Sequence, residues 1–215
     1  MAAYSTLASG TSMAADEDDD DEPKERTPEQ KPQLPESLLD RKLFEARTIT
    51  IFGEINQALA EKVVSKLLAL SAASEDPIKL IICSQGGHVE AGDAIHDFIH
   101  FVRPRVIAIG TGWVASAGAH IFLGAAKANR FCLPNTRFLL HQPLGTVMGR
   151  STDIDIEARE IIRMRDRINR IIARETGQSL EKIERDTDRN FWIVAEEAVE
   201  YGIVSRVIQS ERDIG

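Results

Sequence analysis

A serine among small residues is the first feature of this sequence that could do chemistry. Ser116 lies in the segment Gly112-Trp-Val-Ala-Ser-Ala-Gly118, between a run typical of a strand and a run typical of a helix. Its hydroxyl is sterically open and lies beside helix N–H groups that have no intrahelical acceptor and favour a developing anion. The pattern predicts a nucleophilic serine, and a helix N-cap serine is the simpler alternative. The segment is not a Gly-x-Ser-x-Gly elbow, because residue 114 is valine.

A serine nucleophile needs a general base, and two histidines compete for that role. His120 lies four residues after Ser116 on the same face of the expected helix, which restricts its reach around the hydroxyl. His141 ends the apolar run 138–141, just before Pro143. A polar residue at the carboxyl end of a strand in a parallel sheet faces the usual ligand crevice. We therefore expect His141 to be the base.

A pair of glycines after another strand could hold a reacting group. In Ser84-Gln-Gly-Gly-His88 the glycines allow close approach of a ligand and can point backbone N–H groups into a cleft. A glycine pair after a strand is more often a plain turn. A dinucleotide site is disfavoured because the Gly-x-Gly-x-x-Gly fingerprint is absent. The five histidines have neither cysteine partners nor a His-Glu-x-x-His spacing, so the sequence predicts no metal site.

Strands and helices alternate along residues 37–210 and would position these residues. The expected strands are β-branched and apolar runs, and the expected helices carry apolar residues at helical spacing. The strands are expected at 47–53, 78–83, 105–110, 130–133, 137–141 and 203–208, and the helices at 56–73, 91–102, 116–128 and 153–176, with a short helix before the last strand. This alternation predicts an α/β fold with right-handed βαβ units and a largely parallel sheet.

The negative charge of the chain is concentrated in its first 36 residues. They hold ten acidic and three basic residues and four prolines, with seven consecutive acids at 16–22, whereas residues 37–215 hold 24 acidic and 23 basic residues. We expect 1–36 to be a disordered acidic arm, 37–210 to be one domain and 211–215 to be a C-terminal tail. No basic face argues for binding of nucleic acid.

The absence of targeting features predicts a soluble, cytoplasmic protein. The N-terminus has neither the charged start nor the apolar centre of a signal peptide, and it is too acidic for a transit peptide. The apolar stretch 106–126 contains four glycines, and a buried strand, turn and helix explains it better than a membrane span. Cys83 and Cys132 lie in strand-like runs and are expected to be buried thiols rather than a disulfide.

Eight short motifs between about residues 38 and 208 occur in a characteristic order. They are Ala115-Ser-Ala-Gly118, Ala125-Ala-Lys-Ala-Asn-Arg-Phe131, Leu133-Pro-Asn135, His141-Gln-Pro143 and the segments 152–160, 176–179, 183–189 and 195–198. Together they resemble the family of Clp protease proteolytic subunits, ClpP. The resemblance covers roughly four-fifths of the chain, and several motifs in one order make it specific.

The resemblance implies a ClpP/crotonase-like α/β fold and a serine endopeptidase that cleaves unfolded polypeptides through an acyl-enzyme. By position, the family's nucleophile falls on Ser116, its base on His141 and its oxyanion hole on the backbone N–H groups of Gly87 and Ala117. The family also implies two stacked seven-membered rings around a chamber, a separate AAA+ unfoldase that hydrolyses ATP, and no bound cofactor. The helix at 153–176 would be the handle joining the rings, although its apolar stripe could equally pack on the chain's own core.

Three departures from the family's pattern bear on activity. The catalytic aspartate falls on Asn190, and an asparagine can hold the tautomer of the histidine but cannot stabilise the imidazolium. Gln85 stands where the family usually has proline before the glycines. The acidic arm replaces the segment that forms the family's entrance-pore loops, so the sequence does not predict how an unfoldase would dock.

Two other functions fit parts of the pattern. An acyl-CoA hydratase or isomerase shares the fold and a two-donor oxyanion hole, but the pairing of Ser116 with His141 argues against it. A weakly active structural paralogue that forms mixed rings with an active sister subunit is favoured by Asn190 and by the missing pore segment. The cleavage preference, and whether the rings are homomeric or mixed, stay open.

Overall fold

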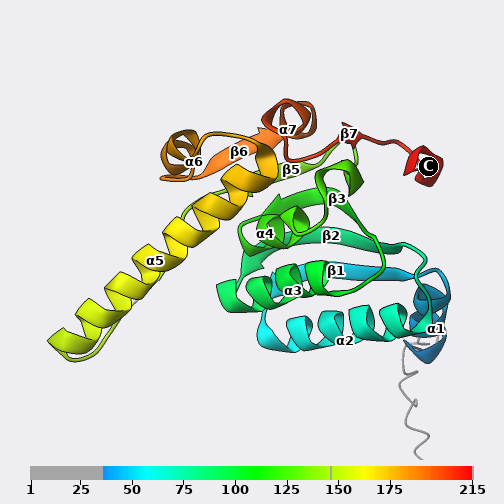
Figure 1. Cartoon of the computed structure of the whole chain (residues 1–215), viewed down its shortest axis with the longest axis horizontal. Helices are drawn as coiled ribbons and strands as arrows, with labels where there is room; N and C mark the ends of the chain where they lie inside the picture. The colour runs from blue at the N-terminus through cyan, green and yellow to red at the C-terminus, as the bar shows by residue number, and fades with distance from the viewer. Residues whose placement is uncertain (1–35, 146, 215) are drawn as a thin grey trace, which may run out of the picture. The chain divides into compact units, whose positions relative to one another are not determined.

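The computed structural model describes residues 36–145 and 147–214 (Figure 1). All of these residues belong to one compact unit, Pro35–Gly215. The predicted disordered arm, residues 1–36, lies outside the described residues except for Glu36, which begins the first helix. The helices are α1 (Glu36–Glu45), α2 (Gln57–Ala73), α3 (Val89–Phe101), α4 (Ala117–Leu123), α5 (Ser151–Thr176), α6 (Leu180–Asp186) and α7 (Ala195–Tyr201), with 3-10 turns at Lys127–Asn129 and Glu211–Ile214. The strands are β1 (Thr48–Ile55), β2 (Ile78–Gly87), β3 (Val106–Ala115), β4 (Arg130–Cys132), β5 (Arg137–Leu140), β6 (Phe191–Val194) and β7 (Arg206–Val207).

The strands form one sheet that branches at β3. The order β1-β2-β3-β4-β7 is parallel throughout. The first half of β3 pairs with β4 and its second half pairs in parallel with β5, while β6 runs antiparallel to β5. The predicted α/β fold with a largely parallel sheet is therefore confirmed, and β6 is its antiparallel exception. The branch places the end of β3 and the end of β5 side by side.

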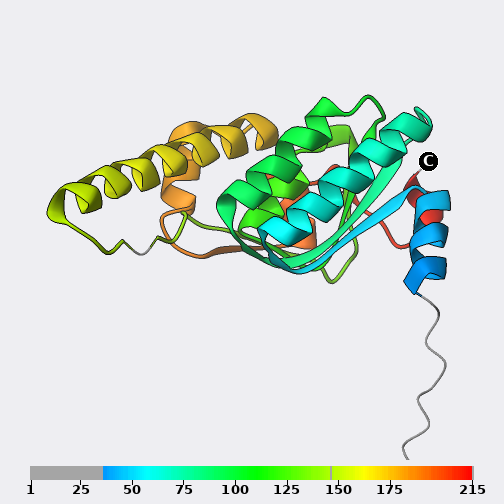
Figure 2. The same ribbon diagram turned by 90° about the horizontal axis from the view of Figure 1, so that it is seen from below.

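Three helices cover one face of the sheet. Figures 1 and 2 show α2, α3 and α4 lying next to one another across β1, β2 and β3. The main core lies between these layers, where isoleucines and leucines of β1 and β2 alternate inward and meet the buried side of α2. Asn56 caps α2 by accepting a hydrogen bond from the N–H of Leu59, which fixes where that helix begins.

The glycine-rich segments continue the strands instead of forming free loops. β2 runs to Gly87 and β3 runs to Ala115, each several residues beyond its expected end, and the pairing of β1 with β2 shifts register between Phe52 and Glu54. Glycines at positive φ permit this continued pairing past the irregularity. The expected helix at 116–128 is shorter because it ends at Leu123 and resumes only as a 3-10 turn.

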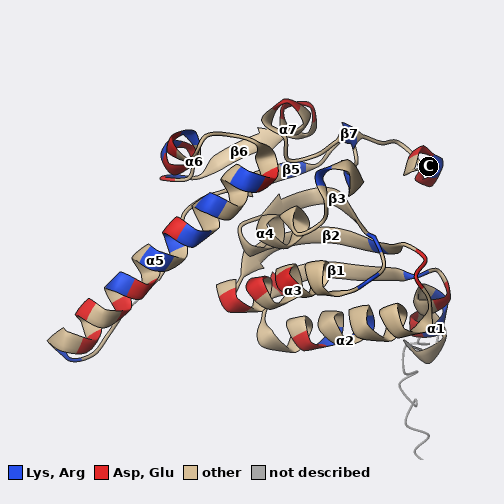
Figure 3. Cartoon of the chain, viewed as in Figure 1, with Lys and Arg blue, Asp and Glu red and all other residues tan. Residues whose placement is uncertain are grey.

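The long helix α5 has two different halves. Every residue from 151 to 160 is exposed, whereas Ile168, Asn169, Ile172 and Thr176 are buried against the rest of the chain. Figure 3 shows acidic and basic residues alternating along the helix, and Figure 1 shows its first turns extending away from the sheet. Packing on the chain's own core therefore explains only the second half of the apolar stripe.

The remaining sequence expectations concern the membrane and the cysteines. Among the described residues, no helix is long and apolar enough to cross a membrane. The stretch 106–126 is β3 followed by α4, as the sequence predicts. Cys83 and Cys132 are free thiols. Cys132 is buried as expected, and burial raises its pKa to about 12, but the expectation of a buried Cys83 is wrong, because this side chain is only partly buried in β2.

Candidate active site

Ser116 occupies a strained turn between β3 and α4. Its backbone has φ 55° and ψ −122°, a conformation that a residue with a side chain rarely adopts. The turn is fixed on both sides, because the N–H of Ser116 donates to the carbonyl of Leu139 at 2.9 Å and its carbonyl accepts from the N–H of His120 at 3.0 Å. Ser116 stands at the N-cap position, but its side chain makes no capping hydrogen bond. The hydroxyl is therefore not committed to the helix.

The glycine segment of β2 lies directly against this turn. A Cβ atom added to Gly86 would come within 2.6 Å of the Cβ of Ser116 and 2.9 Å of the carbonyl oxygen of Ala115. Only glycine fits at this position, which also has φ +96°. Ser84 holds the segment in place by donating to the carbonyl of Gly53 at 2.6 Å and accepting from the N–H of Gly86 at 3.0 Å.

Ser116 and His141 line one cavity. Ala117 and His120 lie in the same lining, and the other walls are apolar side chains from α3, β5 and α5 and from the segment after β5. These apolar residues are Val89, Leu140, Pro143, Ile168 and Ile172. The parallel pairing of β3 with β5 brings the two expected catalytic residues together, because each follows the carboxyl end of one of these strands.

His141 follows β5 and carries an uncommitted ring nitrogen. Its Nε2 atom is buried and finds no hydrogen-bond partner among the described residues. Burial lowers the pKa of His141 below its ordinary value of 6.5, which favours the neutral imidazole that a general base requires. The next residue, Gln142, anchors the segment by donating from its backbone to the carbonyl of Thr187 and from its side chain to the carbonyl of Asp188, both at 2.7 Å.

Asn190 lies near His141 without being bonded to it. The two residues line a second, open cavity together with Asp188 and Arg189, and Asn190 is exposed. The hydrogen bonds found among the described residues include none between Asn190 and His141. The carboxylate of Asp186 is engaged by Lys182 and Tyr201: although burial raises the pKa of this carboxyl, the hydrogen bonds with these two residues lower it overall.

The comparisons with known proteins agree with this geometry. The family model for Clp protease matches residues 36–211. This chain belongs to the Clp protease family. The resemblance and the fold predicted from the sequence motifs are thereby confirmed.

Relatives of this Clp protease chain cover almost its whole length. It is 55% identical over 93% of its length to the ATP-dependent Clp protease proteolytic subunit 3 of Rhizobium johnstonii, of which the match covers 99%. It is 54% identical to the proteolytic subunit 2 of Gluconobacter oxydans, with 93% of this chain and 91% of that protein covered. Among solved structures, an Asn-to-Asp mutant of ClpP1 from Listeria monocytogenes is 56% identical, with a TM-score of 0.78 over 82% of this chain and 99% of the other. The chain is therefore a Clp-type serine peptidase, and no match favours the acyl-CoA hydratase alternative.

The two backbone donors expected for the Clp protease oxyanion hole differ in their surroundings. Ala117 is the first residue of α4 and lines the cavity with Ser116, so its N–H belongs to the first turn, which has no intrahelical acceptor. Gly87 is exposed and pairs with Ile55 at the end of β1. The glycine that packs on Ser116 is its neighbour Gly86.

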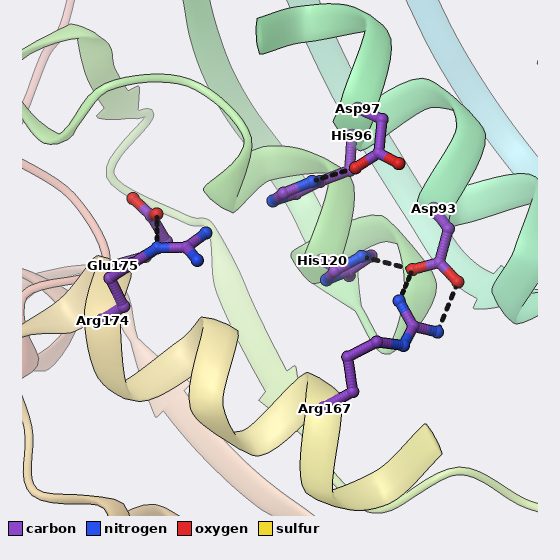
Figure 4. Close-up of polar contacts among 7 residues, drawn as sticks. All are labelled: Asp93, His96, Asp97, His120, Arg167, Arg174 and Glu175. Carbon is purple, nitrogen blue, oxygen red and sulfur yellow. Dashed lines mark hydrogen bonds and ion pairs between the residues drawn. The ribbon is translucent and has the colours of Figure 1, made fainter. Parts of the chain in front are cut away.

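The rival base, His120, is already engaged in this Clp protease chain. Its Nε2 atom lies 2.9 Å from Asp93, which also pairs with Arg167, and its ring stacks on His96 at 4.4 Å between centroids (Figure 4). Sequence reasoning missed Asp93 and Arg167, because they are 74 residues apart and no local motif joins them. Among the described residues, no three His, Cys, Asp or Glu side chains gather as a metal site.

Proposed function

We propose that this chain is an endopeptidase subunit in which Ser116 is the nucleophile and His141 the general base. The observation that carries the proposal is one cavity lined both by an uncapped serine in a strained turn and by a histidine whose buried Nε2 atom has no partner. A neutral imidazole and a free hydroxyl at one cavity are the two parts that serine acylation needs. The two side chains line the same cavity, and hydrogen bonds between catalytic groups commonly tighten when substrate binds.

The proposed reaction forms and then hydrolyses an acyl-enzyme. Ser116 Oγ attacks the carbonyl carbon of the scissile peptide while His141 accepts the hydroxyl proton. The tetrahedral oxyanion accepts hydrogen bonds from the N–H groups of Gly87 and Ala117. On collapse, His141 returns the proton to the leaving amine. A water molecule, deprotonated by His141, then attacks the ester carbonyl, and as the ester bond breaks His141 gives that proton to Ser116 Oγ, which releases the acid and restores the free serine.

Asn190 is proposed as the third member of the site. It lines the open cavity together with His141, and we propose that its amide orients the imidazole during catalysis. A neutral amide cannot stabilise the imidazolium as a carboxylate does, so we expect activity to be reduced compared with a site that has aspartate.

The proposed setting is a ring-shaped chamber. The exposed first half of α5 supports contact between copies of this chain or with a sister subunit, because residues 151–160, which include Ile154 and Ile156, are all exposed among the described residues. We propose two stacked heptameric rings, homomeric or mixed, that degrade unfolded polypeptides delivered by an AAA+ unfoldase in the cytoplasm. A weakly active subunit of mixed rings is the second candidate, and Asn190 is the feature that favours it.

A serine-reactive fluorophosphonate tests the proposed nucleophile. Wild-type protein should be labelled and should hydrolyse short peptides, and Ser116→Ala should lose both while assembling normally. Ser210→Ala changes an exposed serine far along the chain and is the matched control, which should behave as wild type. Labelling that survives in Ser116→Ala would overturn the assignment.

A further inference from the structure

One carboxylate beside the cavity joins three helices, and the proposed hydrolysis does not use it. Asp93 on α3 pairs with both terminal nitrogens of Arg167 on α5, at 2.8 and 2.7 Å. The same carboxylate accepts a hydrogen bond from Nε2 of His120 on α4, at 2.9 Å. Figure 4 shows the three side chains converging from the three helices. A single residue thus ties α3, α4 and α5 together.

The contact between Asp93 and Arg167 differs from the other ion pairs of α5. The remaining ion pairs formed by this helix lie within it, and apart from the Glu175 carboxylate their side chains are largely exposed. This pair instead reaches another element, and its Asp93 side chain is 17% exposed. Burial alone would raise the pKa of Asp93, but the hydrogen bonds from His120 and Arg167 lower it well below its usual range. The two-point fork also fixes the orientation of α5, which a single-point contact would not.

This three-residue network borders the reacting groups. His120 lines the cavity that contains Ser116, and its backbone N–H donates to the carbonyl of Ser116 at 3.0 Å. On the other side, Arg167 directly precedes Ile168, which with Ile172 forms the α5 wall of the same cavity. The network therefore connects two walls of the cavity.

We propose that Asp93 and Arg167 are positioning residues for peptide hydrolysis, holding α5 and α4 in the arrangement that lines the cavity of Ser116 and His141. The inference rests on the proposed function, since it takes Ser116 as the nucleophile. Arg167 supplies the positive charge that balances Asp93, and Asp93 in turn holds the ring of His120, whose backbone N–H fixes the carbonyl of Ser116. The contact therefore links the α5 wall of the cavity to the turn that carries the nucleophile.

Other titratable groups near this network must be considered in any test by pH. From α3 and the end of β5 they are Glu90, His96, Asp97, His100 and His141. His96, which stacks on His120, has its pKa lowered to about 4, mainly by burial. It is therefore neutral near pH 7 and does not compete with Arg167 for the charge of Asp93.

The test compares Arg167→Gln with the double variant Asp93→Asn/Arg167→Gln in the full-length, assembled protein. Arg167→Gln removes the two-point contact that holds α5 and leaves the partly buried carboxylate of Asp93 without its cation. We expect kcat on a short fluorogenic peptide to fall about tenfold with a smaller change in KM, and the deficit to be similar at about pH 7 and about pH 9, because the loss is one of geometry. The double variant removes both charges and keeps groups of similar shape, so it should recover part of the lost kcat.

Three further results decide the inference. Arg167→Lys keeps the charge without the two-point contact and should show an intermediate kcat, and it also serves if Arg167→Gln fails to assemble. A change in KM larger than the change in kcat for Arg167→Gln, or a double variant no better than the single one, would overturn the positioning role. Ser116→Ala separates the two proposals. If Ser116→Ala keeps hydrolysis, the proposed function fails. If Ser116→Ala is inactive but the variants of Asp93 and Arg167 hydrolyse peptide like the wild type, only this inference fails.

Discussion

At the scale of single residues, the side chain at position 190 decides how much charge faces His141. The imidazole is neutral at rest, since burial lowers its pKa, and it must become a cation when Ser116 attacks. Asn190 lies at the same open cavity and offers only an amide dipole to that cation. Asp188 lines this cavity too and is an alternative source of negative charge, whereas Asp186 is engaged by Lys182 and Tyr201.

Asn190→Asp is expected to raise turnover at least about tenfold, well short of the factor of about 10⁴ that the reverse change costs in a chymotrypsin-type triad. The gain is smaller because the site has formed around an asparagine. The pH at which kcat/KM rises to half of its maximum should also change. In the wild type this midpoint should lie below pH 6.5, because the pKa of His141 is lowered and the base is active when deprotonated. A new carboxylate favours the protonated ring, so in the mutant this midpoint should shift to higher pH.

Both quantities are measured with a short fluorogenic peptide on wild-type and mutant protein whose assembly has been checked. Asp188→Asn is the matched control, because it removes a charge from the same cavity. If Asp188 already serves His141, Asp188→Asn lowers turnover and Asn190→Asp has no effect. Unchanged or lower turnover of Asn190→Asp in an intact assembly would remove Asn190 from the catalytic group.

At the scale of elements, the contact between the end of β2 and the β3–α4 turn shapes the site. Gly86 and Gly53 both have positive φ, at +96° and +79°, and they lie close to each other at the irregular end of the β1–β2 pairing. An added Cβ at Gly86 would strike Ser116 and Ala115, whereas one at Gly53 would meet nothing within 4 Å. Substituting these two glycines therefore distinguishes the effect of backbone strain from the effect of a clash with Ser116.

Gly86→Ala should reduce hydrolysis by about 10² or more, because displacing the nucleophile by about 1 Å has effects of that size. Gly53→Ala carries a similar backbone penalty, about 1 kcal/mol, without the clash, and it should keep most of the activity. The measurement is kcat/KM together with thermal unfolding of both variants. Equal activity losses in the two variants would mean that strain, rather than contact with Ser116, makes glycine necessary.

The elements that the sequence predicted well are those with a local signal. The apolar periodicity of α2 and the β-branched runs of β2 and β3 located them within a few residues. By contrast, β6 was missed because its four residues, Phe191–Val194, show no alternation of their own and become a strand only by pairing with β5. The same reason applies at the site: Ser116 and His141 stood out by type and by their place at strand ends, but Asp93 and Arg167 meet only in the folded chain.

At the scale of the whole molecule, the first half of α5 carries apolar side chains that the described part of the chain leaves exposed. Ile154, Ile156 and Ile162 are 41%, 52% and 51% exposed, and Leu144 and Met148 in the preceding segment are exposed to 85% and 89%. A monomer in solution rarely leaves so many large apolar side chains together in water. Packing of this region against another copy would remove them from solvent and would leave the charged side chains of the helix at the rim (Figure 3).

Ile156→Glu should therefore weaken assembly, because it places a charge where an apolar contact is expected to form. Wild-type protein at micromolar concentration should sediment as a particle many times the mass of one chain, and the variant should shift toward single rings or smaller species. Thr152→Glu adds the same charge at an exposed polar position of the same helix and should leave the particle intact. Analytical ultracentrifugation of the three proteins distinguishes these cases. A wild type that sediments as a monomer, or a Thr152→Glu particle as unstable as that of Ile156→Glu, would show that the exposed isoleucines of α5 do not form the interface.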